Sequence, residues 1–289
     1  MRPRFLYVGC VPNQSLPIWP EREPPWVMGI LNVTPDSFSD GGKFFATEDA
    51  LVHALRLIDE GADILDVGAE STRPGSSPVP PELQIERLTP VIARIRTLWQ
   101  GPISIDTQSA EVAESALKSG ATWVNDISAL RGDPRMRHIV RTYNCPIVLM
   151  HMRGVPASMQ QDPVYGDVVA EVREFLLQQA ASLTAAGFPA DGIILDPGIG
   201  FGKTTEHSMA LLRNLAQLAA AGFKILVGAS RKSFIGHLSG AAPADRLPGS
   251  VAAALWSVQN GATIIRVHDV AATRQALSVW QGIGAQLPL

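Results

Sequence analysis

The residues in this chain that could do chemistry stand directly after short apolar runs. Asn32 follows one such run, Asp106 another and Asp196 a third. A charge at the end of a buried strand must be paired, hydrogen-bonded or solvated in a ligand cavity. The mixture of carboxylates, cations and carboxamides suits a ligand with a polar heterocycle at one side and an anion at the other. The full set is Asn32, Thr72, Arg73, Asp106, Asn125, Asp126, His151, Asp196, Arg231, Lys232, Arg266 and His268.

Several of these residues also have a purely structural interpretation. Asp106 and Asp126 could each cap the helix that follows, because aspartate is favoured at helix N-termini. Arg266 could pair with Asp269 at the rim of the fold. Asp66 is expected to be a structural carboxylate that holds the loop after the second strand. These interpretations explain the residues singly, but they do not explain why so many polar groups gather after apolar runs.

Some better-known motifs are absent or incomplete. The Gly202–Lys203–Thr204 sequence resembles a P-loop, but that motif needs a glycine six residues before the lysine, and Pro197 stands there. No His and Glu spacing indicates a zinc site, and no serine lies in a G-x-S-x-G motif. The carboxamide of Asn32 could still help to hold magnesium, a hard cation that accepts oxygen ligands and bridges phosphates.

The elements that must position these residues alternate regularly along the chain. The run at 28–33 has no polar alternation, which is typical of a strand buried on both faces. We expect strands at 28–33, 64–67, 103–106, 123–125, 147–150, 192–195, 225–227 and 263–267. Helical spacing of apolar residues predicts helices around 51–58, 83–99, 111–118, 133–143, 169–183, 211–218, 248–259 and 271–280.

Eight strands alternating with helices favour a single (β/α)8 TIM barrel in the α/β class. We assign residues 1–25 to an irregular, proline-rich lead-in and residues 26–289 to the barrel domain. A doubly wound open sheet is the alternative, because alternation alone does not show that the sheet closes. In a barrel, the active site lies at the C-terminal ends of the strands. The polar residues listed first lie at these strand ends or in the loops that follow them.

Composition limits the classes of partner. The 289 residues are 46% hydrophobic and 18% charged, with a net charge of −3. We therefore expect a globular protein with small-molecule partners and no general attraction to nucleic acid or to an anionic membrane. The only cysteines, Cys10 and Cys145, have no metal or redox spacing, which favours a cytoplasmic location. We expect neither a signal peptide nor a membrane span.

The ordered motifs of the chain resemble those of the dihydropteroate synthase family. They are GILNVTPDSFSDGGKF, DVGAESTRPG, SIDT, NDI, LMHMRG, LDPGIGFGK, VGASRKS, RLPGS and RVHDV, and they extend from Gly29 to Val270. The resemblance implies a pterin-binding (β/α)8 barrel that joins 4-aminobenzoate to 7,8-dihydropterin-6-ylmethyl diphosphate and releases diphosphate. It further implies magnesium as cofactor, a homodimer and sensitivity of the family to sulfonamides. One departure is Ala229, where a methionine is expected.

The resemblance also implies a role for each polar residue. The pterin would meet Asp106, Asn125, Asp196 and Lys232, and the diphosphate would meet Asn32, Arg73, Arg266 and His268. The aminobenzoate would meet Phe38, Thr72, Arg73, Pro74, Phe201, Lys232 and Ser233. Asp106, Lys232, Arg266 and His268 would be catalytic, and Asn32 would help to hold the metal. Independently of the resemblance, a carboxylate such as Asp196 can accept the paired N–H groups that a pterin presents.

Two other classes of function stay open at this level. A pterin-dependent methyltransferase domain would share the barrel and the pterin-facing aspartates, but it would not need the SFSDGGKF and ESTRPG loops. A non-catalytic pterin-binding paralogue would be expected to lose Arg73, Lys232, Arg266 or His268, and all four are present. We also expect aminobenzoate to bind after the diphosphate substrate, because its site draws on two loops with no hydrophobic repeat of their own.

Overall fold

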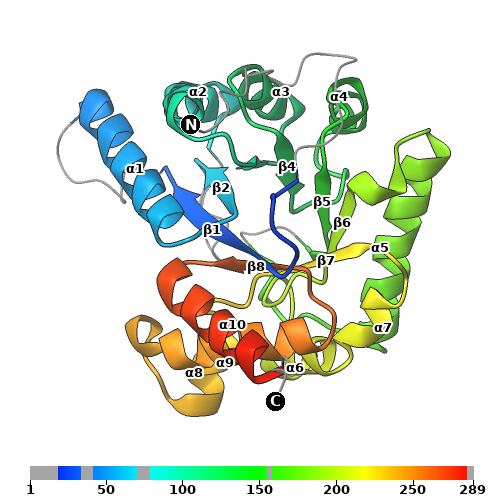
Figure 1. Ribbon diagram of the computed structural model, residues 1–289. Helices are drawn as coiled ribbons and strands as arrows, with labels where there is room; N and C mark the ends of the chain where they lie inside the picture. The colour runs from blue at the N-terminus through cyan, green and yellow to red at the C-terminus, as the bar shows by residue number, and fades with distance from the viewer. Residues whose placement is uncertain (1–18, 34–41, 70–78, 155–157, 285–289) are drawn as a thin grey trace.

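The computed structural model describes residues 19–33, 42–69, 79–154 and 158–284, without the side chains of 42–46. Eight parallel strands close into a barrel in the order β1 to β8, and helices surround it (Figure 1). The predicted TIM barrel is therefore confirmed, and the open sheet is excluded. The strands are β1 Trp26–Asn32, β2 Ile64–Gly68, β3 Ile103–Asp106, β4 Trp123–Asp126, β5 Ile147–Met150, β6 Ile193–Asp196, β7 Lys224–Val227 and β8 Ile264–Val267.

The helices follow the strands as the apolar spacing predicts, with two differences. The helices are α1 Gly42–Asp59, α2 Pro81–Leu98, α3 Ala110–Lys118, α4 Met136–Tyr143, α5 Val168–Ala185, α6 Thr205–Arg213, α7 Leu215–Ala219, α8 Ser233–Ser239, α9 Leu247–Gln259 and α10 Val270–Gly284. The prediction of one helix through residues 211–218 was wrong, because the backbone leaves helical geometry at Asn214 (φ −106°, ψ 17°). The short α8 was not predicted, since its seven residues are too few to display a helical period.

Residues of the strands alternate between two cores. Inward-facing side chains such as Met28, Ile64 and Ile194 form a cluster inside the barrel. Outward-facing ones such as Leu65 and Ile105 pack against the helices in a larger core. This alternation explains the unbroken apolar runs, because both faces of every strand are buried. It also means that a polar residue at an inward position must lie in the barrel interior.

The end of the barrel where the strands begin is closed by aromatic rings. Trp19, from the segment before β1, stacks on Trp26 at 5.6 Å and meets Trp123 edge-on at 4.9 Å. The ammonium of Lys224 lies 4.1 Å from the centroid of the Trp19 ring. In Figure 1 the dark blue segment before β1 crosses the middle of the barrel. This end is therefore sealed, which directs attention to the opposite end.

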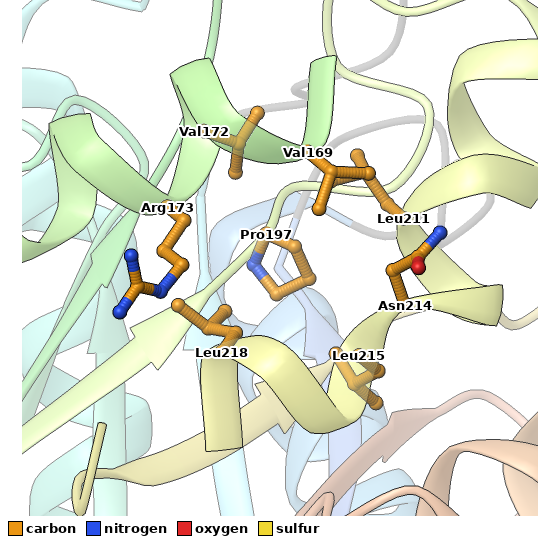
Figure 2. A pocket seen from close by; sticks show the side chains of 8 residues that line it. All are labelled: Val169, Val172, Arg173, Pro197, Leu211, Asn214, Leu215 and Leu218. Atoms are coloured by element: carbon orange, nitrogen blue, oxygen red, sulfur yellow. The ribbon is translucent and has the colours of Figure 1, made fainter. Parts of the chain in front are cut away.

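A small gap lies outside the barrel, between α5 and the α6–α7 region (Figure 2). Pro197, which directly follows β6, projects into it among Val172, Leu211 and Leu218. Its volume is about 10 Å³, which is at the lower limit for a single water molecule. This gap is a packing feature and not a ligand site. Among helices built from the described residues, none is both long and apolar enough to cross a bilayer.

Candidate active site

An arginine held between two carboxylates forms the centre of the open barrel end. The Nε of Arg266 on β8 donates to Asp66 Oδ2 on β2 at 2.6 Å, and its Nη2 donates to Asp106 Oδ2 on β3 at 2.8 Å. Asn125 on β4 donates its Nδ2 to the same Asp66 oxygen at 3.1 Å. Four strands thus contribute to one network. Burial acts to lower the pKa of Arg266, but the two carboxylates outweigh this effect and raise it.

This network corrects two expectations. Arg266 does not pair with Asp269, because it occupies an inward position of β8 and reaches across the barrel instead. Asp269 forms its ion pair with Arg231, at 2.6 Å between Oδ1 and Nη2. Asp66 does not serve the loop after β2: it is fully buried inside the barrel. Its second oxygen, Oδ1, is also buried and has no hydrogen-bond partner among the described residues.

Asp196 and Lys232 form the other side of the site. Asp196 ends β6, is 5% exposed and accepts the Gly198 N–H at 2.7 Å. Burial raises the pKa of Asp196 to about 6. Burial, followed by the charge of Arg266, lowers the pKa of Lys232 to about 8. The Lys232 ammonium lies 3.9 Å from the centroid of the Phe201 ring, so this cation is held between an aromatic face and the charged network.

The loop after β6 is built on glycines because it packs directly against another backbone. Gly198 has φ +66°, and a Cβ there would lie 2.0 Å from the carbonyl oxygen of His151. Gly202 has φ +60°, and its Cβ would lie 2.3 Å from the carbonyl oxygen of Arg153. Side chains are excluded at both positions by conformation and by contact. The DPGIGFGK motif therefore describes a loop pressed onto the loop after β5.

Lys203 joins the same two loops. Its buried Nζ lies 2.9 Å from His151 Nδ1 and donates to the carbonyls of His151 and Phe201 at 3.2 and 3.0 Å. Burial lowers the pKa of Lys203 to about 7 and that of His151 to about 3. With three acceptors around one ammonium, Lys203 fixes Phe201 beneath Lys232. The lysine that resembled part of a P-loop therefore has a structural role.

The loops after β7 and β8 are joined side by side. The Oγ of Ser230 lies 3.0 Å from His268 Nδ1, and Arg231 donates from two nitrogens to both oxygens of Asp269. Arg231 has φ +57°, a left-handed conformation that is uncommon for a residue with a side chain. Its N–H donates to Ser250 Oγ on α9 at 2.8 Å. This turn fixes Lys232 at the barrel mouth.

The structure thus brings together most of the described residues predicted for the site. Asn32 ends β1 beside Gly68 of β2, His268 follows β8, and Ser233 begins α8 with an exposed side chain. Asp126 is fully buried and accepts the N–H groups of Ser128 and Leu130, so it holds the turn after β4. It does not cap the helix that follows, because the N-cap of α4 is Arg135. Phe38, Thr72, Arg73 and Pro74 lie outside the described residues.

Sequence reasoning missed three contributors to the site. Asp66 was assigned to a loop, and neither Lys203 nor Ser230 received a role. The period of two along β2 could have revealed Asp66, because Ile64 and Gly68 flank it on the inward face. Ser230 lies in the VGASRKS motif, but its partner His268 is 38 residues away, so the sequence does not indicate their contact.

No cluster of three or more His, Cys, Asp or Glu side chains suited to a metal ion occurs within residues 19–33, 42–69, 79–154 and 158–284. Magnesium is bound in many phosphate-handling sites by one or two protein oxygens together with water and substrate phosphates. The carboxamide oxygen of Asn32, at the end of β1, fits this second type of site.

Comparison with known proteins places the chain in a family. The model of the family described as "Pterin binding enzyme" matches residues 28–268. Dihydropteroate synthase of Neisseria meningitidis serogroup B is 49% identical over 269 residues, covering 91% of this chain and 94% of the relative. The enzyme of Escherichia coli K12 is 46% identical over 255 residues, covering 88% and 90%.

Solved structures agree with the sequence relatives. Xanthomonas albilineans dihydropteroate synthase with 4-aminobenzoic acid has a TM-score of 0.86 and 47% identity, covering 93% of this chain and 95% of that one. The same enzyme in complex with 7,8-dihydropteroate has a TM-score of 0.82 and 44% identity, covering 92% and 95%. The chain belongs to the pterin-binding enzyme family and, within it, to the dihydropteroate synthases.

Proposed function

We propose that this barrel mouth condenses 4-aminobenzoate with 7,8-dihydropterin-6-ylmethyl diphosphate by a dissociative substitution assisted by magnesium. The observation that carries the proposal is the convergence of Asp106, Asn125, Asp196, Lys232 and Arg266 at the mouth of one barrel. They supply acceptors for a pterin and cations for a diphosphate within one network. The related structures with 4-aminobenzoic acid and with 7,8-dihydropteroate support the same pair of substrates.

Pterin recognition rests on matching donors with acceptors. An ionised Asp196 accepts the ring N–H and the exocyclic amino group together, and Lys232 donates to the ring carbonyl. Asn125 directs its Nδ2 to Asp66, so its carbonyl oxygen is the end that remains to accept a pterin N–H. Asp106 takes a further ring nitrogen. The buried position of Asp196 makes each of these hydrogen bonds stronger than it would be in water.

The diphosphate is bound on the side of β1 and β8. Arg266 and His268, with Asn32 and Arg73, supply donors and positive charge to its oxygens. Asn32 would contribute its carboxamide oxygen to magnesium, and the remaining ligands would be water and phosphate oxygens. When bound, magnesium offsets the negative charge that grows on the departing diphosphate.

The bond changes need no strong base from the protein. The C–O bond between the pterin methylene and the diphosphate breaks, and its electron pair leaves with the phosphate oxygen. The positive charge on the methylene is delocalised into the pterin and is stabilised by Asp106. The aniline nitrogen then forms the C–N bond and loses a proton to water or to the released diphosphate. Arg266 has two tasks here, since it orients Asp106 and contacts the leaving group.

The aminobenzoate is placed at the outer side of the mouth. Phe201 and Lys232 provide a ring face and a cation, and Ser233 provides an exposed hydroxyl at the start of α8. Phe38, Thr72, Arg73 and Pro74 are assigned to this site from the family resemblance.

A second copy of the chain is the proposed protein partner, in a cytoplasmic homodimer. A groove of about 440 Å³ lies among α6, α8 and α9 and is lined by Leu212, Phe234, Ile235, Leu238 and Trp256. Leu238 is 62% exposed and Trp256 is 48% exposed beside it. Large apolar side chains gathered around a groove are typical of protein contacts. Sedimentation of wild type and of Leu238→Glu tests this, because a dimer formed here would give a monomeric variant.

A diphosphate-release assay tests the proposed reaction. Release should require both the pterin diphosphate and 4-aminobenzoate, and it should fall when magnesium is chelated. Product formation is followed in parallel by mass spectrometry, which identifies the new C–N bond. Release in the absence of aminobenzoate would indicate simple hydrolysis, and binding of the pterin without turnover would indicate a non-catalytic paralogue. Either outcome would contradict the proposal.

A further inference from the structure

We propose that Ser230 is a positioning residue that holds neutral His268 with its proton on Nε2. Ser230 is 6% exposed, and its Oγ lies 3.0 Å from His268 Nδ1. The same oxygen accepts the backbone N–H of His268 at 3.3 Å. The serine therefore contacts both the main chain and the ring of one residue. The inference rests on the proposed function in one respect, namely that the ring addresses the diphosphate.

The tautomer follows from the single proton of the hydroxyl group. A serine hydroxyl has one O–H donor and two acceptor lone pairs, and here one lone pair receives the His268 N–H. Among the described residues, His268 Nδ1 is the only atom near Ser230 Oγ that can accept its proton. A buried donor that makes no hydrogen bond is costly. The hydroxyl therefore donates to Nδ1, which must carry a lone pair, so the proton of the neutral ring is on Nε2.

The surroundings hold this contact in place. The next residues along the two loops, Arg231 and Asp269, form a two-pronged ion pair at 3.0 and 2.6 Å. Arg231 is held in its left-handed conformation by Ser250, and its carbonyl accepts from Arg246. Ser230 and His268 are thus flanked by a second link between the same loops. A hydroxyl fixed in this way can specify one tautomer and one ring orientation.

The consequence concerns the anion. A ring with its proton on Nε2 presents an N–H donor to a phosphate oxygen without having to be charged. The other tautomer would present a lone pair, which a phosphate oxygen repels. A neutral donor also keeps diphosphate binding intact at a pH where an unperturbed histidine has lost its charge. Ser230 would therefore act on the leaving group through His268 and would not touch it.

Nitrogen-15 NMR of histidine-labelled protein tests the tautomer directly. The chain has six histidines, so a His268→Gln variant assigns the signals. In the ligand-free wild type above pH 7.5, we expect His268 Nε2 to carry the proton and Nδ1 to have the shift of an unprotonated nitrogen. In Ser230→Ala, a second population with the proton on Nδ1 should appear. Ser230→Thr keeps the hydroxyl and should restore the single tautomer.

Calorimetry then tests whether the tautomer serves the diphosphate. Ser230→Ala should weaken binding of the pterin diphosphate by roughly three- to ten-fold, which corresponds to one hydrogen bond, and leave a pterin without phosphates unaffected. Ser257→Ala is the matched control, because this fully buried serine donates, among the described residues, only to the Ala253 carbonyl within α9.

Three results would overturn the proposal. The first is a proton on His268 Nδ1 in the wild type, and the second is an unchanged tautomer in Ser230→Ala. The third is an equal loss of affinity in Ser230→Ala for the pterin diphosphate and for the pterin without phosphates. His268→Gln, measured with the same two ligands, separates this failure from failure of the proposed function. If that variant binds the diphosphate normally, the assignment of His268 to the diphosphate is wrong, whatever the tautomer.

Discussion

Two buried aspartates, Asp63 just before β2 and Asp66 in the middle of it, show how differently the two ends of the barrel are built. Asp63, at the closed end, uses both carboxylate oxygens: Oδ1 accepts from Arg22 at 2.9 Å, and Oδ2 accepts from the Val27 N–H and from Arg274. Asp66, three residues later and inside the open end, uses only Oδ2, while its buried Oδ1 has no partner among the described residues. The first carboxylate is fully satisfied, and the second is not.

The charged groups at the two ends of the barrel also differ in their surroundings. Two arginines share Asp63, and the stacked rings of Trp19 and Trp26 close the same end of the barrel. At the open end, burial raises the pKa of Asp196 and lowers that of Lys232, so both groups are held in an environment that disfavours their charged forms. Folding alone gains nothing from such groups. We conclude that the closed end is built for stability and that the open end is built to be completed by ligands.

The substitution Asp196→Asn should have the largest effect, and it tests whether the open end is built for ligands and not for stability. Replacing an acceptor oxygen with an amino group sets donors against the pterin N–H groups, which should weaken pterin binding about 100-fold. The free energy of unfolding, in contrast, should not fall. Because the pKa of Asp196 rises from 3.8 to about 6 on folding, its stabilising contribution is complete at low pH and is lost as pH rises through about 6. A permanently neutral side chain keeps that contribution.

Calorimetric titration with a pterin and urea unfolding at pH 7 measure the two effects of Asp196→Asn. We expect weaker binding together with a free energy of unfolding that is unchanged or higher by roughly 1–3 kcal/mol. Normal pterin affinity in the folded variant would remove Asp196 from the pterin site. A large loss of stability would show instead that the open end is optimised for folding.

A matched pair of substitutions on the two aspartates tests the comparison itself. Asp63→Asn leaves Arg274 without a full countercharge and should lower the free energy of unfolding by about 2 kcal/mol, with kcat/KM unchanged. Asp66→Asn releases Arg266 and Asn125 and should lower kcat/KM at least about ten-fold, with a smaller loss of stability because Arg266 keeps Asp106. Urea unfolding and steady-state kinetics on both variants are sufficient. The comparison fails if the two variants behave alike.

The pH dependence of kcat/KM should show both charged groups of the open end. Asp196 must be ionised to accept the pterin donors, so activity should fall as pH drops below about 6. Lys232 must be protonated to donate, so activity should also fall as pH rises above about 8. Each limb should approach a ten-fold change per pH unit. Lys232→Arg should move the alkaline limb upward, and a limb that stays in place would exclude Lys232 as its source.

Much of the fold could be predicted because local patterns report it. The eight strands were placed within two residues, since a strand buried on both faces gives an apolar run that needs no tertiary information. The break at Asn214 and the short α8 were missed, because neither alters the apolar spacing enough to be detected. The packing of Trp19 under the barrel was not predicted, because it depends on the Trp123 ring far away in the sequence.

The site was less predictable than the fold, for a physical reason. Strand ends identified Asp106, Asn125, Asp196 and Arg266 as neighbours, because all parallel strands end at one side of a barrel. The strand ends did not show which side chains pair with each other, because a pair such as Arg266 and Asp66 is separated by 200 residues. The structural interpretation of Arg266 therefore paired it with the carboxylate nearest in sequence, Asp269, although its inward position places it across the barrel. Pairing depends on register and on the length of the side chain, which a single sequence does not display.

The smallest expected effect concerns the order of binding. The assigned aminobenzoate contacts include Phe38, Thr72, Arg73 and Pro74, from two loops rich in glycine, serine and proline. Of the residues assigned to the pterin, Asp106, Asn125 and Asp196 lie on strands of the barrel. If the diphosphate with magnesium orders these loops, the cost of ordering is met by the first ligand, and the second finds a formed pocket. Aminobenzoate affinity should then rise several-fold in the presence of pterin, diphosphate and magnesium, and a sulfonamide should behave in the same way. Titration of aminobenzoate with and without these ligands decides the matter. Equal affinities would mean that barrel packing alone forms the aminobenzoate pocket. The conclusion that the open end is completed by ligands would then apply to the pterin and diphosphate sites only.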